Sequence, residues 1–407
     1  MSDPIVHAND ARKADEIARQ RDLPADAPAT YRMWEDRTSP YSAKMRAFLR
    51  YKRIPYRRMR TTVAHYEQEI RRLVGFPIIP VVLAPDDTVL QDSTPMTRWL
   101  EARHPEPATL PPDPRLGFVH DLLEDFADEY VIRLSMHCRW GSEQSRETFG
   151  RRIARYFTYG MPGVALEAVT QVIRGRQTGF DAYLGIDDAV RPDLDRQVVE
   201  LLELLDAHLA DLGYLLGERP SVADFALAGQ LWAHGFRDPH WTTAFERHGP
   251  RVCDWLEEIE ELGDTQGALG RTRFGDWLDP AAGLPATLER LLAFVAATWL
   301  PWSRASARAD AAGEKTARAA IRGVETAYAT HPYRAWAWEQ MQRALVALGA
   351  ADRAWVDDVL TRAGLLPDLL ADGVLHCDLY DGLTPPVIRD GVGDNRHRRR
   401  PRDAGTR

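Results

Sequence analysis

The sequence predicts a small α/β domain with a mixed sheet, followed by an all-helical domain and by extra helices toward the C-terminus. Between residues 29 and 105, short β-branched and aromatic runs alternate with stretches of helical periodicity, in the order β-α-β-α-β-β-α. A proline-rich linker follows at 105–114, and from Leu116 onward apolar residues recur mostly at helical spacing. A chain of 407 residues is long enough for two or three such units.

The elements of the first domain are bounded by clear breaking signals. We expect strands at 31–34, 56–61, 78–83 and 88–90, and helices at 41–52, 66–74 and 92–102. Arg53-Ile54-Pro55 ends the first helix, because proline cannot continue it. Asp86-Asp87 is typical of a hairpin turn between the last two strands, and His104-Pro105 ends the last helix.

The second domain, expected over 115–265, reads as helix throughout. Its clearest helix is predicted at 194–212, where the apolar residues fall at helical spacing: Val198, Leu201, Leu202, Leu205, Leu209 and Leu212. Ser221 and Asp224 stand at the head of the next apolar helix in the positions of an N-terminal capping box. We therefore interpret this pair as a folding element rather than a catalytic dyad.

The remaining segments are a leader, an extension and a tail. Residues 1–28 are polar and are expected to form a flexible leader, and 386–407 a basic, disordered tail. Between them, 278–385 is expected to be a helical extension, with helices at 284–300, 333–348 and 351–363. His376-Cys377-Asp378 is not a catalytic trio, because adjacent residues do not readily converge on one point.

Composition excludes several classes of protein. The formal net charge of −8 argues against a general nucleic-acid binder. The cysteines Cys138, Cys253 and Cys377 lie far apart without metal-type spacing, which indicates a reducing compartment. The longest apolar run, 291–302, is too short to span a bilayer, and the N-terminus lacks a signal-peptide pattern. We expect a cytoplasmic protein with no membrane or nucleic-acid partner and no metal.

The segment Ser39-Pro40-Tyr41-Ser42 joins the first expected strand to the first helix. Proline is accepted in a first helical turn, where backbone N–H groups are unpaired and the positive end of the helix dipole lies. Such a site lowers the pKa of a thiol, and thioredoxin-type redox proteins place a Cys-x-x-Cys pair there. Here both cysteine positions are serine. The thiol should therefore arrive with a ligand, and disulfide exchange by the protein itself is disfavoured.

These motifs, taken together and in order, resemble the cytosolic glutathione S-transferase superfamily, in its serine-type, bacterial form. The resemblance covers roughly residues 30–265. Its matching segments are Ser39-Pro40-Tyr41-Ser42, Ile54-Pro55-Tyr56, Ile79-Pro80-Val81-Val82, Gln91-Asp92-Ser93-Thr94, 216–224 and 248–256. It implies a thioredoxin-like N-terminal domain followed by the all-α C-terminal domain of that family, here with extra C-terminal helices.

The resemblance implies a binding site for glutathione in the first domain. Ser93, at the head of a helix, would bind the γ-glutamyl carboxylate, and Asp92 would meet the ammonium. The cysteinyl backbone would pair with Ile79, held open by a cis bond to Pro80. For Asp92 and Ser93 the alternative is a plain helix cap, since both residue types are favoured there.

Ser39 is the residue that the resemblance makes catalytic, as the hydroxyl donor to the glutathione thiolate. Such a donor favours the charged form of the thiol and lowers its pKa. The alternatives are that Ser39 merely caps the helix, or that Thr38 provides the hydroxyl. Ser42, inside the first turn, is expected to be structural.

An electrophile pocket is expected between the domains, on the first helix of the second one. Tyr130, Arg133 and His137 recur at three- and four-residue spacing and so share one helix face. A mixed aromatic and basic face suits an apolar or anionic second substrate. Ordinary helix packing is the alternative for each of the three.

The sequence thus predicts a glutathione transferase that uses glutathione as co-substrate, needs no other cofactor, and transforms a small electrophile. Glutathione-dependent isomerisation or peroxide reduction would use the same site. A non-catalytic interaction protein on the same fold, or a biosynthetic enzyme using another small thiol, remain alternatives. The resemblance also implies a homodimer.

Overall fold

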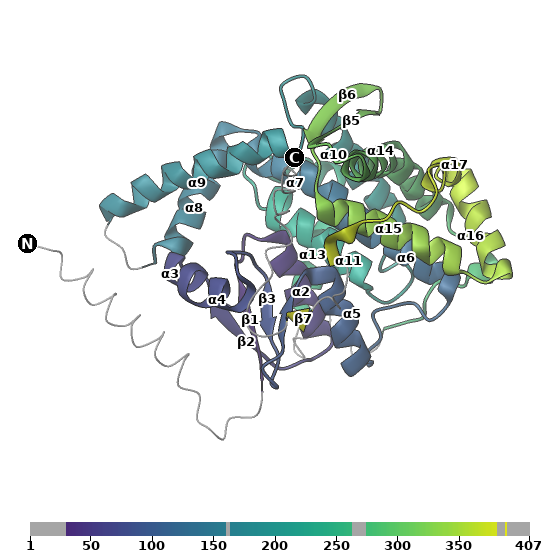
Figure 1. Ribbon diagram of the computed structural model, residues 1–407, viewed down its shortest axis with the longest axis horizontal. Coiled ribbons are helices and arrows are strands. Elements are labelled where there is room, and N and C mark those ends of the chain that lie inside the picture. Colours follow the sequence, from purple (N-terminus) through teal and green to yellow (C-terminus); the bar gives the residue numbers. More distant parts are fainter. Residues whose placement is uncertain (1–29, 160–162, 263–273, 381–386, 389–407) are drawn as a thin grey trace, which may run out of the picture.

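The computed structural model describes residues 30–159, 163–262, 274–380 and 387–388 (Figure 1). An α/β domain is followed by a helical domain and by a C-terminal extension that packs on the helical domain. The expected leader, 1–28, and most of the expected tail, 386–407, lie outside the described residues. Among the described helices, none is both long and apolar enough to cross a membrane.

The first domain follows the predicted order of elements. They are β1 (Tyr31–Glu35), α2 (Pro40–Tyr51), β2 (Tyr56–Arg60), α3 (Val63–His65), the π-helical turn η1 (Tyr66–Ile70), α4 (Arg71–Val74), β3 (Val81–Leu83), β4 (Val89–Gln91) and α5 (Ser93–Arg103). β1 runs parallel to β2 and antiparallel to β3, and β3 pairs antiparallel with β4. The predicted thioredoxin-like mixed sheet is confirmed.

Side chains alternate between the two faces of this sheet, as the two-residue period of a strand requires. Met33, Val82 and Leu90 pack with α2 and α5 into the main hydrophobic core. On the other face, Trp34 and Val81 belong to a separate cluster with η1 and α4. The sheet is thus covered on both sides, and α2 is pressed between it and the second domain.

A fifth strand, β7 (Val387–Ile388), was not predicted. It pairs antiparallel with β4, with Val89 opposite Ile388, and completes the order β2-β1-β3-β4-β7. The expectation of disorder from 386 onward is therefore wrong for these residues. An edge strand offers unpaired backbone groups to any extended segment, and so this pairing needs no local sequence signal.

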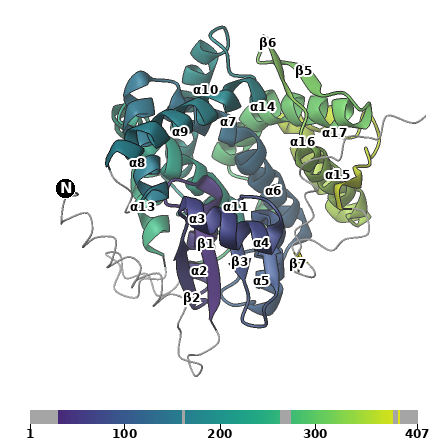
Figure 2. The same cartoon turned by 60° about the vertical axis from the view of Figure 1, so that its left-hand side comes forward.

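The second domain is helical, as predicted. Its elements are α6 (Pro114–Asp125), the π-helical turn η2 (Phe126–Val131), α7 (Ile132–Trp140), α8 (Glu143–Phe157), α9 (Gly163–Tyr183), α10 (Arg191–His208), α11 (Val222–Leu231), the π-helical turn η3 (Trp232–Phe236), α12 (Thr242–His248) and α13 (Pro250–Glu261). The α8–α9 pair and the extension lie on opposite sides of α7 in both views (Figures 1 and 2).

The extension contains a hairpin as well as helices. Its elements are the 3-10 turn η4 (Pro280–Ala282), α14 (Ala286–Ala311), β5 (Thr316–Ile321), β6 (Val324–Ala329), α15 (Pro332–Ala347), α16 (Ala350–Ala363), α17 (Leu366–Leu369) and the 3-10 turn η5 (Asp378–Tyr380). Arg322 and Gly323 both have positive φ, the geometry of a two-residue hairpin turn. The expectation of helices alone over 278–385 missed this hairpin, because arginine replaces the asparagine or aspartate that usually marks such a turn.

The extension shares a core with the second domain instead of forming one of its own. Phe294 packs edge-on against Phe126, and Trp302 packs edge-on against Tyr130. Trp299 donates its indole N–H to Asp125 Oδ2 at 2.7 Å. These contacts hold α14 against α6 and η2, and they bring the start of α15 to the seam between the two domains.

Candidate functional site

The first turn of α2 begins where the sequence predicts. Ser39 is the N-cap, and its Oγ accepts a hydrogen bond from the Ser42 backbone N–H at 3.3 Å. α11 packs closely on this turn because it carries Gly229 there: a Cβ on Gly229 would lie 2.7 Å from the Pro40 carbonyl oxygen. The second domain therefore fixes the position of the Ser39 turn.

Beside this turn lies a cavity of about 150 Å³. Its walls come from the first domain, from η2 of the second, and from the segment that enters α15. The lining residues are Tyr41, Ile78, Ile79, Pro80, Gln91, Asp92, Ser93, Asp128, Glu129, His331 and Tyr333. All four residues predicted to bind glutathione line this one cavity.

The backbone of these four residues is unusual in ways that shape the cavity. The Ile79–Pro80 peptide bond is cis, as predicted. Asp92 has φ +83°, a conformation rare outside glycine, and it caps α5, accepting the Met96 N–H on its carbonyl oxygen at 2.9 Å. Ser93 is the first residue of α5 and is buried. The N-terminus of an eleven-residue helix therefore opens on the cavity wall.

Ser39 itself is not among the described residues that line this cavity. Its capping bond uses a lone pair of Oγ, so its O–H proton can still be donated. The Thr38 hydroxyl is engaged in the turn, because its Oγ1 donates to Asp36 Oδ1 at 2.5 Å. Ser42 Oγ accepts the Asp36 N–H at 3.4 Å and is fully buried. The catalytic role of Ser39 remains a prediction.

Tyr41, the third residue of this motif, does line the cavity. It was not predicted as a site residue. It donates to the Asp128 carbonyl oxygen at 2.9 Å. Burial, reinforced by the charges of Glu129 and Asp128, raises its pKa well above the usual value. The phenol therefore stays protonated and remains a hydrogen-bond donor. Its position, two residues after Ser39 in the same motif, was the available signal.

A buried ionic network joins the two domains behind the cavity. Lys44 Nζ lies 2.7 Å from Glu124 Oε1 and 2.5 Å from Asp128 Oδ2. Thr94 Oγ1 also donates to Asp128 Oδ2, at 3.1 Å. Burial alone would raise the pKa of Glu124, but the nearby Lys44 and Arg98 hold this pKa below its usual value. This carboxylate therefore stays ionised and paired, and it ties α2 and α5 to α6.

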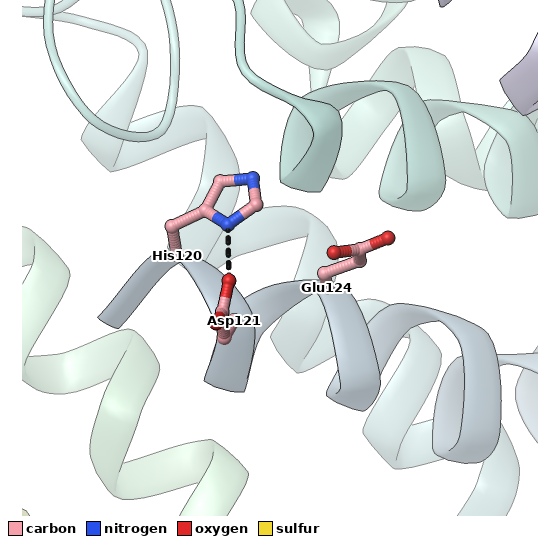
Figure 3. Close-up of side chains that lie close together, drawn as sticks. All are labelled: His120, Asp121 and Glu124. Atoms are coloured by element: carbon pink, nitrogen blue, oxygen red, sulfur yellow. Dashed lines mark hydrogen bonds and ion pairs between the residues drawn. The ribbon is translucent and has the colours of Figure 1, made fainter. Parts of the chain in front are cut away.

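His120, Asp121 and Glu124 stand on one stretch of α6 with their side chains close together (Figure 3). His120 Nδ1 lies 2.8 Å from Asp121 Oδ1, and its Nε2 accepts the Ala223 N–H at 3.3 Å. Arg98 pairs with both carboxylates, at 2.5 Å from Asp121 and 3.2 Å from Glu124. With both ring nitrogens engaged and the acids paired to a cation, the chemistry of this trio is that of an ion-pair network.

Two further acids, Asp125 at the end of α6 and Glu129 in η2, each have a partner, but burial outweighs its effect. Burial raises the pKa of Glu129 to about 7, against the opposing effect of Arg334, whose Nε lies 3.4 Å from Glu129 Oε2. Burial, together with the charge of Glu129, raises the pKa of Asp125 well above the usual value. Glu129 is thus a cavity-lining acid that exchanges its proton near neutral pH.

Tyr130, Arg133 and His137 share a helix face, but that face turns away from the cavity into the core. Tyr130 donates to Gln197 Oε1 at 2.7 Å. Arg133 donates to the carbonyl oxygens of Leu184 and Gly185, and His137 Nε2 lies 2.7 Å from Asp195 Oδ1. The structure does not bring these three residues to the cavity that Ser93 lines, because η2 presents Asp128 and Glu129 there instead.

The fold and the cavity define a thioredoxin-like domain, joined to a helical domain, with a cavity of about 150 Å³ at the cis-proline. Residues 34–108 match the glutathione S-transferase N-terminal domain, and residues 188–258 match the glutathione S-transferase C-terminal domain. The chain thus contains segments that match both domains of the glutathione S-transferase superfamily. Residues from 259 onward, including the described extension, lie outside both matches.

Solved structures of related fold are distant. A glutathione S-transferase from Rhodospirillum rubrum is 16% identical, with TM-score 0.38, over 62% of this chain and 94% of that one. One from Methylobacterium radiotolerans, in complex with glutathione sulfonate, is 17% identical, with TM-score 0.35, over 61% and 100%. A beta-etherase from a Sphingobium strain is 17% identical, with TM-score 0.42, over 56% and 94%. No curated protein matches the chain significantly.

Proposed function

We propose that this protein is a glutathione-dependent transferase that joins the sulfur of glutathione to a small electrophile. The observation that carries the proposal is the convergence of Ile79, Pro80, Asp92 and Ser93 on one cavity beside the Ser39 turn. The proposed enzyme acts in the cytoplasm as a homodimer, with glutathione as co-substrate and no other cofactor.

The first domain supplies the contacts for the tripeptide. Ser93 donates its hydroxyl and backbone N–H to the γ-glutamyl carboxylate, which the N-terminus of α5 also attracts. Asp92 accepts the ammonium of the same residue. The cysteinyl backbone lies against Ile79 like an added strand.

Hydroxyl donors then stabilise the sulfur as thiolate. A donor to the charged form lowers the pKa of the thiol, so more thiolate is present near neutral pH. Ser39 is the proposed donor. Tyr41 is the alternative, because its side chain lines the cavity, but it would have to exchange its hydrogen bond to the Asp128 carbonyl oxygen for one to the sulfur. The sulfur attacks an electrophilic carbon, a C–S bond forms, and the leaving group departs with its electron pair while the thiol proton passes to solvent.

A thermal-shift titration tests the binding step. Millimolar glutathione should raise the melting temperature of the full chain, because a ligand that binds only the folded state stabilises it. Ser93→Ala should abolish that rise, whereas Ser142→Ala, which removes the cap of α8 away from the cavity, should keep it. A chromogenic aryl halide with glutathione then measures turnover. The absence of any shift in the native chain would overturn the proposal.

The size of the cavity favours one second candidate, a non-catalytic interaction protein with the fold of a glutathione transferase. At about 150 Å³ the cavity is smaller than the roughly 300 Å³ at which ligand pockets usually begin. His331 and Tyr333 of the extension account for part of one wall. The same titration separates the two, because this candidate predicts no stabilisation by glutathione and no turnover.

A further inference from the structure

A second, smaller cavity adjoins the first on the side of the extension. Its volume is about 90 Å³. Its lining residues are Thr94, Arg98, Asp121, Glu124, Asp125, Asp128, Tyr333, Trp336, Ala337, Gln340, Met341 and Ala344. Asp128 and Tyr333 line both cavities, so they form the boundary that a second substrate would share with the tripeptide.

The walls of this pair of cavities carry more acids than bases. The carboxylates are Asp92 at the cap of α5, and Asp121, Glu124, Asp125, Asp128 and Glu129 of α6 and η2. Among the described residues, the cationic side chains that pair with those of α6 and η2 are Lys44, Arg98 and Arg334, with His120 beside Asp121.

Asp128 supplies a separate indication of a ligand. Its side chain is 6% exposed. Oδ2 is occupied by Lys44 and Thr94, whereas the buried Oδ1 has no hydrogen-bond partner among the described residues. Buried acceptors are nearly always paired, so an unpaired one on a residue that lines two cavities is a candidate partner for an incoming N–H donor.

The second cavity also has an aromatic lining. Tyr333 and Trp336 lie on the first turns of α15, with ring centroids 5.3 Å apart. Both side chains are half-buried and line the cavity. Aromatic faces attract organic cations, and they do so more strongly in a desolvated site. Acids and aromatic rings around one cavity are a combination that recognises an alkylammonium group.

We propose that the second substrate of this transferase carries a small organic ammonium group, held between Asp128 and the Tyr333–Trp336 pair. The inference rests on the proposed function. The cavity is smaller than the roughly 150 Å³ engineered cavity that admits benzene, so the ammonium carries few carbon atoms. Burial raises the pKa of Asp125. A bound cation would favour the ionised form of this carboxyl group, so binding should release protons.

Calorimetry on the full chain tests this with butylamine hydrochloride and, as an uncharged match, 1-butanol. Butylammonium should bind at least tenfold more tightly than butanol, and its heat should vary with the ionisation enthalpy of the buffer. Asp128→Asn should weaken butylammonium at least tenfold, whereas Asp188→Asn, at a fully exposed carboxylate, should not. Because Asp128 also pairs with Lys44, Trp336→Leu serves as a second variant that leaves that pair intact and should weaken binding as well.

Glutathione is titrated separately, so that the two proposals can fail independently. Equal binding of butylammonium and butanol in a protein that binds glutathione overturns the amine inference alone. Competition between butylammonium and glutathione also overturns it, because Asp128 then serves the ammonium of the tripeptide. Butylammonium binding without any glutathione binding supports the ammonium site and overturns the transferase.

Discussion

Lys44 Nζ of the first domain lies 2.5 Å from Asp128 Oδ2 of the second. Both side chains are nearly fully buried, and Glu124 completes the contact at 2.7 Å from the same nitrogen. Because Lys44 belongs to α2 and its two partners to α6 and η2, this contact crosses the interface between the domains. The pair lies directly behind the proposed substrate cavities, so it couples the stability of the domain interface to the geometry of the site.

Replacing Lys44 with methionine should destabilise the protein by about 3–5 kcal/mol, because it leaves buried carboxylates without their cation. The free energy of unfolding from urea denaturation measures the effect. Arg71→Met is the matched control, since Arg71 pairs with Glu67 on the surface, where both side chains are about half exposed. A change in Lys44→Met no larger than that of the control would show that the interface does not depend on this network.

The raised pKa of Glu129 should make stability fall as pH rises. The pKa of Glu129 is about 7 in the folded protein against its ordinary value of 4.5, so the folded state holds a proton that the unfolded state releases. Relative to Glu129→Gln, the native chain should lose stability progressively between about pH 4.5 and 7 and level off above. Urea denaturation at a series of pH values measures the difference. A constant difference across that range would contradict the shift.

Local signals predicted much of the fold, because the residues that carried them act over short distances. The strand around Met33 alternates its side chains between two cores, and Ser221 and Asp224 form the predicted capping box. The cis bond at Pro80 and the convergence of Asp92 and Ser93 followed from the family resemblance. Each of these features depends on neighbours close in the chain or on the type of domain that the family resemblance identifies.

The parts that were missed depend on contacts between distant segments. β7 pairs with β4 across almost 300 residues, and neither strand carries a signal for the other. Tyr333 reaches the cavity only because α14 packs on η2 and delivers the start of α15 there. Tyr130 shares a helical face with its predicted partners, but spacing alone does not say whether such a face meets a cavity or a core.

The capping box gives a further test of stability. Ser221 Oγ accepts the Asp224 N–H at 3.3 Å, and Asp224 accepts the backbone N–H groups of Ser221 and Leu215, both at 2.8 Å. Ser221→Ala should cost about 1 kcal/mol, the usual loss for an N-cap. Asp224→Ala should cost more, because it leaves buried donors without an acceptor. Urea denaturation of both variants measures this, and an equal loss would contradict the extra role of Asp224.

The three hydroxyls of the opening motif can be separated by kinetics. If Ser39 donates to the thiolate, Ser39→Ala should raise the pKa of bound glutathione by about one unit and lower kcat/KM near pH 7 about tenfold. Ser42→Ala, whose Oγ only accepts the Asp36 N–H, should change stability more than rate. Tyr41→Phe is the decisive comparison, because Tyr41 and not Ser39 lines the cavity. At saturating glutathione, the pH dependence of kcat/KM for the electrophile measures the pKa of the bound thiol in all three variants. A normal profile in Ser39→Ala with a shifted one in Tyr41→Phe would move the thiolate donor from the cap of α2 into its first turn.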